Sequence, residues 1–316
     1  MIVTLTPNPS IDRTVSVPAL EHGEVNRASG SRIDPGGKGI NVARALATNG
    51  TDALAVLPSG GPEGHLLQAL LRRAGTAYAA VPIEGTTRMN IAVIEPDGTT
   101  TKLNEPGPTL SDDELDALLA AVDEHLSPDL RWIVGCGSLT PGMPTTIYAD
   151  LVRRGHAHGI KVAIDSSGAP FTAAIPAGPD LIKPNHEELE ELVGRRLHSL
   201  AEVGEAARTL VDGGIGTVIV SLGRHGALLV NADAVAHASA HVARPVSTVG
   251  AGDSLVAGYL HAVCRGATPR EALATGVAWG AAAVSLPGSR MPGPDDIAAI
   301  TVTSTDTPDL TLCLID

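Results

Sequence analysis

The chain has 316 residues with a net charge of −13 at pH 7, and this charge argues against nucleic acid and anionic membranes as partners. Hydrophobic residues make up 43% of it, ample for a core, but only 2% are aromatic, so that core must be aliphatic. The three cysteines, Cys136, Cys264 and Cys313, form no CxxC pair or zinc spacing. We therefore expect free thiols in a reducing cytoplasm. The amino terminus has no basic segment and no apolar run reaches about 18 residues, so we expect neither a signal peptide nor a membrane anchor.

Strands and helices alternate from the amino terminus. Residues 2–6 are rich in β-branched side chains and predict a strand that Pro7 stops. Asp12 is thus expected near the carboxyl end of a strand, where open α/β sheets bind ligands, although an Asx-turn explains it equally well. A strand over residues 53–57 and a helix over residues 64–74 follow.

The segment Gly36-Gly37-Lys38-Gly39 opens a helix that continues through Asn41. It is not a P-loop, because the spacing GxxxxGK[ST] is absent and no Ser or Thr follows Lys38. A lysine between glycines at a helix start is still well suited to phosphate or hydroxyl oxygens. A solvated lysine in a turn remains the alternative.

Two separate stretches resemble short exposed strands. Residues 13–35 contain alternating apolar and polar runs, and residues 88–104 predict a hairpin around Pro96-Asp97-Gly98. Arg88 and Asn90 share one face of the first hairpin strand. We expect both stretches to join into one small antiparallel sheet that forms a lid.

The second half of the chain continues the alternation. A capping box at Ser111 opens a helix to about residue 126, and a further helix is expected over residues 269–285. Strands are predicted at 132–135, 161–164, 181–182 and 217–222, with a hairpin partner at 226–230 and a possible last strand at 310–315. The pattern predicts a doubly wound, mostly parallel sheet flanked by helices. Its core would comprise residues 1–12, 36–87 and 105–316, and its lid residues 13–35 and 88–104.

Residues 247–254 read Ser-Thr-Val-Gly-Ala-Gly-Asp-Ser and precede an apolar helical face. This places Gly250 to Asp253 on the first turn of a buried helix, where free N–H groups favour an anion. An acid would repel a phosphate there, which suggests that Asp253 accepts a proton. A carboxylate that simply complements the helix dipole explains the segment equally well.

Other signals favour no competing function. His156 and His158 do not share a helix face and are expected at the surface, and no His or Cys pattern predicts zinc. The glycines at 213–216 precede a strand, whereas a dinucleotide fingerprint follows one, and GxSxG is absent.

The small-residue loops at strand ends should converge on one crevice. That crevice would offer cations, carboxylates and an anion-binding helix start, from Asp12, Lys38, Asn41, Arg88, Ser138, Lys183, Asn185, Glu188 and Asp253. Phosphoryl transfer requires such groups for positioning, charge neutralisation and proton removal.

With these motifs in order, the sequence resembles the ribokinase/PfkB family of sugar kinases over nearly its whole length. Residues 35–43 and 247–254 are similar to the two family signatures, and 137–139, 183–188 and 221–223 are similar to its middle landmarks. Residues 6–12 and 23–27, together with Lys38, are most similar to the 1-phosphofructokinase and tagatose-6-phosphate kinase branch. Glu24 is acidic where related 6-phosphofructokinases tend to be basic.

The resemblance implies a role for each matching residue. Asp253 would be the base, and Gly250, Ala251 and Gly252 would form the anion hole. Asp12 and Asn41 would hold sugar hydroxyls, and the substrate phosphate would meet Lys38 and Arg88, with Gly37, Asn90 and Ser138 nearby. The ATP side would be lined by Lys183, Asn185, Ser221, Gly223 and Gly226, with Glu188 holding Mg²⁺ through water.

The same resemblance implies an ATP- and Mg²⁺-dependent kinase of a sugar phosphate, with fructose 1-phosphate as the favoured substrate. Tagatose 6-phosphate is the first alternative, followed by fructose 6-phosphate or a catalytically silent sugar-phosphate sensor. The lid would close over the sugar and could mediate a homodimer.

Overall fold

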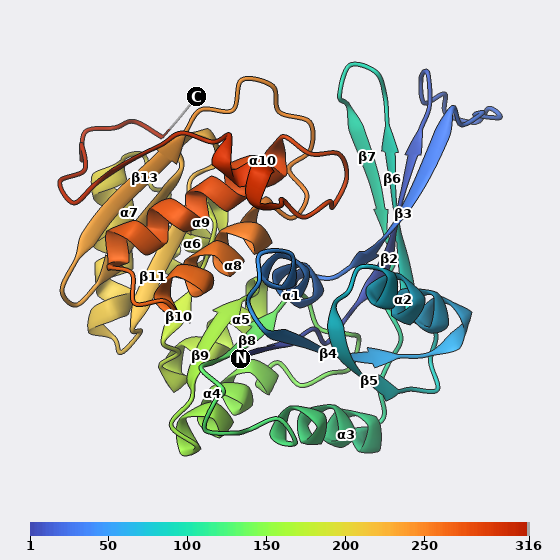
Figure 1. Cartoon of the computed structure of the whole chain (residues 1–316), viewed down its shortest axis with the longest axis horizontal. Coiled ribbons are helices and arrows are strands. Elements are labelled where there is room, and N and C mark those ends of the chain that lie inside the picture. Colours follow the sequence, from blue (N-terminus) through green and yellow to red (C-terminus); the bar gives the residue numbers. More distant parts are fainter. Residues whose placement is uncertain (315–316) are drawn as a thin grey trace.

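A computed structural model describes residues 1–314, which contain a ten-stranded sheet and a four-stranded sheet (Figure 1). From one edge, the large sheet runs in parallel through β5 (Ala77–Pro82), β4 (Ala53–Ser59), β1 (Ile2–Leu5), β8 (Trp132–Cys136), β9 (Lys161–Asp165), β10 (Leu181–Ile182) and β11 (Thr217–Ser221). It ends in antiparallel β12 (Ala227–Asn231), β13 (Val235–Ala240) and β14 (Val302–Thr305). The predicted mostly parallel, doubly wound sheet is confirmed.

Successive residues of a strand point to opposite sides of the sheet. Both sides carry apolar residues here, and helices cover both. Ile2 belongs to the core cluster of one face and Val3 to that of the other. The first face is covered by α1 (Lys38–Thr48), α2 (Gly61–Arg73), α8 (Ala251–Val263), α9 (Pro269–Val284) and the short α10 (Pro294–Ala298). The second is covered by α3 (Asp112–Asp123), α4 (Ile147–Ala157), α5 (Gly168–Ala174), α6 (His186–Val193) and α7 (Leu200–Asp212). Within residues 1–314, no helix is long and apolar enough to cross a membrane.

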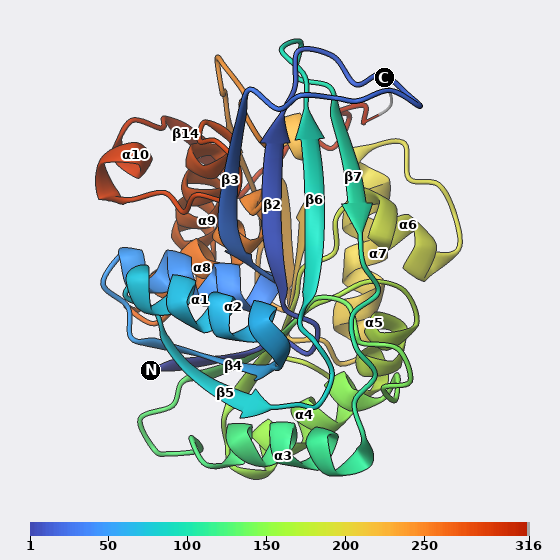
Figure 2. The ribbon, with the colours of Figure 1, turned by 90° about the vertical axis from the view of Figure 1, so that its right-hand side faces the viewer.

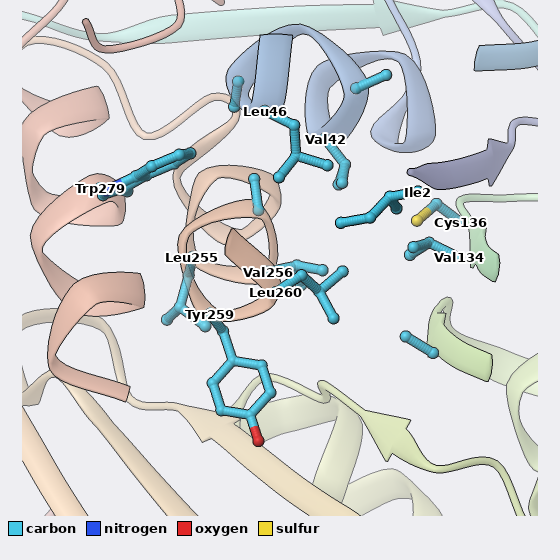
Figure 3. Packing of buried hydrophobic residues seen from close by; sticks show 14 of the residues in the cluster. Ile2, Val42, Leu46, Val134, Cys136, Leu255, Val256, Tyr259, Leu260 and Trp279 are labelled. Carbon is cyan, nitrogen blue, oxygen red and sulfur yellow. The ribbon is translucent and has the colours of Figure 1, made fainter. Parts of the chain in front are cut away.

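Helix α8 lies in the centre of the first layer (Figure 3). Its side chains Leu255, Val256 and Leu260 are buried and point in different directions, while Gly258 faces Trp279 of α9. A helix that is apolar all round is fixed in position by its neighbours. The amino-terminal end of α8 is therefore held at a defined place above the sheet.

The four-stranded sheet stands beside the large one, in the order β3 (Gly30–Gly36), β2 (Ser10–Ser16), β6 (Arg88–Ile94) and β7 (Thr100–Asn104) (Figure 2). The two predicted patches thus form one sheet. Each patch is an antiparallel hairpin, but the central strands β2 and β6 are parallel, because each leaves the large sheet in the same direction. Asp12 lies inside β2 rather than at the end of β1.

Three strands were not predicted. β5 and β13 are rich in alanine and lack the β-branched pattern that indicates a strand. β14 has β-branched residues, but it is only four residues long and polar. The strand expected at 310–315 is not formed by its described residues: the tail makes one isolated bridge, between Cys313 and Ser199, and residue 315 lies outside the described part.

The close packing of α8 on α9 gives a stability prediction. A Cβ at Gly258 would lie 2.8 Å from Trp279 Cγ and 3.0 Å from Gly276 Cα. Gly258→Ala should therefore lower the free energy of unfolding in urea by about 1–3 kcal/mol. Gly204→Ala is the control, because its Cβ would meet only Leu228 Cδ2, at 3.8 Å, and should leave stability unchanged or higher by up to about 1 kcal/mol. Equal effects of the two substitutions would contradict this packing account.

Candidate active site

The start of α8 separates two cavities. Gly250 precedes the helix in a left-handed conformation with φ of 78°, and no side chain in the described residues caps this end. Thr248, Ala251 and Gly252 line a cavity of about 800 Å³, whereas Val249 lines a smaller one of about 180 Å³. The expected helix start at Gly250 to Asp253 is observed, and its N–H groups lie between the two cavities.

Asp253 is a buried carboxyl on the first turn of α8. Asn41 Nδ2 on α1 donates a hydrogen bond of 2.8 Å to its Oδ2. Burial, together with the negative charge of Asp165, raises the pKa of Asp253 to about 6, although Lys38, Asn41 and Lys183 oppose the rise. Such a carboxyl is ionised at neutral pH and basic enough to accept a proton from a hydroxyl.

Asp165 acts on the charge of Asp253 and forms ion pairs with two lysines. Its Oδ1 lies 2.8 Å from Lys38 Nζ and 3.5 Å from Lys183 Nζ. Burial alone would raise the pKa of Asp165 and lower that of Lys38, but their attraction outweighs it, so the pKa of Asp165 is lowered and that of Lys38 raised. Both groups are therefore charged at neutral pH.

Asp165 was not among the predicted site residues. The available signal is its position at the end of β9, just before Ser166-Ser167-Gly168, because other small-residue loops at strand ends carry predicted site residues. Its Oδ2 is buried and has no hydrogen-bond partner among the described residues. A buried polar atom of this kind commonly marks a place that a ligand or water completes.

The smaller cavity is lined by Asp12 and Asn90, among others. Asp12 Oδ1 accepts hydrogen bonds from Ser10 Oγ at 2.7 Å and from Asn90 Nδ2 at 3.0 Å. Arg88 donates to the carbonyl oxygens of Asn8 and Glu105 at 3.0 and 2.9 Å. The Oδ1 of Asn90 and the Nε of Arg88 are buried without a partner in the described part of the chain. The set can both donate to and accept from a polar ligand.

Asn8 is a second residue that sequence reasoning missed, and it connects loops. Its Nδ2 lies 3.4 Å from Ser138 Oγ, 2.9 Å from the carbonyl oxygen of Pro106 and 3.1 Å from that of Leu139. Gly107 must be glycine here, since its φ is +91° and a Cβ would lie 2.3 Å from Asn8 Oδ1. Asn8 thereby holds Ser138 close to the loops at Pro106 and Leu139, outside the lining of the smaller cavity.

The larger cavity contains most residues predicted for the ATP side. Asn185, Ser221, Gly223 and Gly226 line it, together with small and aliphatic residues of α9. Lys183 is not in the lining, but its Nζ lies 3.4 Å from the Cβ position of Gly252. Asn185 and Glu188 also form a capping box at the start of α6, so part of each side chain is already engaged.

The geometry around Asp12 allows a direct test. A Cβ at Gly36 would lie 2.4 Å from the Asp12 carboxyl, so Gly36→Ala must displace that carboxyl. If Asp12 holds a sugar hydroxyl, kcat/KM for a sugar phosphate should fall by about 10–100-fold, mainly through KM. Gly30→Ala on the same strand is the matched control, because nothing lies within 4 Å of its Cβ position. An unchanged KM in Gly36→Ala would remove Asp12 from the binding site.

Comparison with known proteins finds relatives over most of the chain. The family model for pfkB family carbohydrate kinases matches residues 6–296. A 1-phosphofructokinase of Rhodobacter capsulatus is 37% identical over 305 residues, which cover 96% of this chain and 96% of that protein. The ATP-dependent 6-phosphofructokinase isozyme 2 of Escherichia coli is 36% identical over 302 residues, which cover 95% of this chain and 97% of that protein.

A solved structure shows the same fold. The crystal structure of phosphofructokinase-2 from Escherichia coli in complex with substrates and products matches with a TM-score of 0.90 and 36% identity, covering 94% of this chain and 97% of that one. The similarity spans both sheets and includes both glycine-rich segments, because the matched family region begins before Asp12 and ends after Asp253. The chain belongs to the pfkB family of carbohydrate kinases.

Proposed function

We propose that the protein is an ATP-dependent 1-phosphofructokinase, which transfers the γ-phosphoryl group of ATP to the 6-hydroxyl of fructose 1-phosphate. The observation that carries the proposal is Asp253, a buried base whose pKa is raised to about 6, on a helix start between two cavities. Relatives named 1-phosphofructokinase at 35–39% identity support the choice of substrate. Relatives named 6-phosphofructokinase at 36–37% identity make fructose 6-phosphate the main competitor.

In this proposal the sugar phosphate occupies the smaller cavity and ATP the larger. Asp253 removes the proton of the accepting hydroxyl as its oxygen attacks the γ-phosphorus. The bond from the γ-phosphorus to the β–γ bridging oxygen breaks, ADP leaves with that oxygen, and the carboxyl later releases the proton to solvent. The backbone N–H groups at Gly250 to Gly252 stabilise the charge on the transferred group. Lid closure by the small sheet would exclude water and limit ATP hydrolysis.

Lys38 and Lys183 would neutralise negative charge on the phosphate groups. Lys183 lies beside Gly252 and would face the ATP phosphates. Lys38 is joined to the same Asp165 oxygen, which places it with Lys183 rather than with Arg88. These contacts favour a role for Lys38 at the transferred phosphoryl group, and Arg88 stays a predicted cation for the phosphate already on the sugar.

Magnesium fits this site as an ion that arrives with ATP. Among residues 1–314 no group of three His, Cys, Asp or Glu side chains could cage a metal. Mg²⁺ usually keeps several waters and binds through one or two carboxylates together with substrate phosphates. Glu188 is half-buried, acts on the charge of Lys38 and would hold the ion through water. The ion would neutralise charge on the β- and γ-phosphates.

The small sheet also offers a surface for a homodimer. Strand β7 is exposed along its whole length, and unpaired edges of this kind pair readily with another chain. Val25 and Leu103 are 78% and 59% exposed, which is unusual for apolar side chains of their size. We propose that a second copy of the chain covers this sheet.

A substrate panel tests the proposed activity. We expect kcat/KM with ATP and Mg²⁺ to be highest for fructose 1-phosphate, above fructose 6-phosphate and tagatose 6-phosphate. A preference for either competitor would contradict the 1-phosphofructokinase proposal but keep the mechanism. Tight binding of a sugar phosphate without turnover would indicate a silent sensor instead.

Asp253→Asn tests the proposed base in the same assays. The amide has similar size but cannot accept the proton, so the rate should fall by about 10²–10⁴-fold with little change in unfolding by urea. Near-normal turnover of this variant would remove Asp253 as the base.

A further inference from the structure

Arg44 is a buried cation to which the mechanism above assigns no role. It lies on α1 and is only 9% exposed. Its Nη1 donates to the carbonyl oxygens of Pro35 and Ser289, at 3.2 and 3.1 Å, and to Asn41 Oδ1 at 3.2 Å. Burying a guanidinium is costly unless polar partners surround it, so these contacts need an explanation.

The contact with Asn41 continues to the proposed base. Asn41 and Arg44 are three positions apart and share one face of α1. Asn41 accepts from Arg44 with its Oδ1 and donates to Asp253 Oδ2 with its Nδ2, at 2.8 Å. Arg44, Asn41 and Asp253 thus form one directed chain of hydrogen bonds.

The direction of this chain follows from the chemistry of its members. A guanidinium has only donors, whereas a side-chain amide has one donor end and one acceptor end. A hydrogen bond between them exists only when Oδ1 of Asn41 faces Arg44. The NH₂ group must then face Asp253, where it stabilises the ionised carboxylate.

We propose that Arg44 is a positioning residue for the catalytic base, which fixes the amide of Asn41 so that it donates to Asp253. The inference rests on the proposed role of Asp253. Without Arg44 the amide is free to rotate and to present Oδ1 to the carboxylate. That orientation repels the ionised form and removes one of its few donors.

The charged groups around both ends are defined. Asp253 faces Asp165 at the end of β9, Lys38 on α1 and Lys183 after β10. Arg44 faces Asp34 and Arg32 of β3 and Asp12 of β2. Burial lowers the pKa of Arg44, but an arginine stays protonated over the pH range of an activity assay. A change of activity with pH in that range therefore reports the carboxyl and not the guanidinium.

A double-mutant cycle tests the proposal. We expect Arg44→Met to lower kcat/KM for the preferred sugar phosphate by about 10–100-fold in the natural sequence, the size of a hydrogen bond to a charged group. In an Asn41→Ala background the same substitution should cost little more, because the residue through which it acts is gone. An equal loss in both backgrounds would show that Arg44 only ties Pro35 and Ser289 together, and would overturn the proposal.

The pH profile gives a readout that a merely structural role would not move. The acidic limb of kcat/KM should shift to higher pH in Arg44→Met, because a rotated amide disfavours the ionised carboxylate. Arg44→Lys keeps a donor and should restore part of both the rate and the limb. If Arg44→Met does not fold, Arg44→Lys and Arg44→Gln complete the cycle. A lower rate with an unshifted limb would contradict the inference.

The outcomes separate this inference from the proposed function. Near-normal turnover of Asp253→Asn would remove the base itself, and with it both proposals. An inactive Asp253→Asn together with additive effects of Arg44→Met and Asn41→Ala would leave the kinase mechanism in place and overturn only the role of Arg44.

Discussion

The site depends on a set of four charges: the buried Asp165, Asp253 and Lys183, and the half-buried Lys38. Asp165 binds Lys38 and Lys183 through one oxygen, and its negative charge acts on Asp253. A buried carboxylate is tolerable only when cations and hydrogen bonds compensate it, so each member constrains the others. As a result, Asp165 is held ionised, whereas Asp253 has a raised pKa and is the stronger base. That division suits a base beside an anion-binding helix start.

The fold supplies these groups from distant parts of the chain. Asp165 ends β9, Lys183 follows β10, and Lys38 opens α1, so parallel strands and a packed helix bring them to one edge of the sheet. The tight contact between α8 and α9 then fixes the position of Asp253 relative to that edge. Packing far from the reacting groups therefore contributes directly to their geometry.

Much of this arrangement could be predicted because its signals are local. The helix start at Gly250 to Asp253 and the alternation of strands and helices follow from neighbouring residues. The pairing of Asp165 with Lys38 joins residues that are 127 positions apart, and no local pattern announces it. The same holds for the contact of Arg44 with Ser289 and for the parallel pairing of β2 with β6. The site roles remain predictions, whereas the places of the residues are now defined.

The pH dependence of activity in the natural sequence and in Asp165→Asn tests the charge set most directly. Removing the negative charge of Asp165 leaves two lysines near Asp253, so the pKa of Asp253 should fall from about 6 and the acidic limb of kcat/KM should move to lower pH. The ionisation of the substrate phosphate is the same for both proteins and cancels in the comparison. A limb that stays in place or moves to higher pH would contradict the central claim that Asp165 sets the basicity of Asp253.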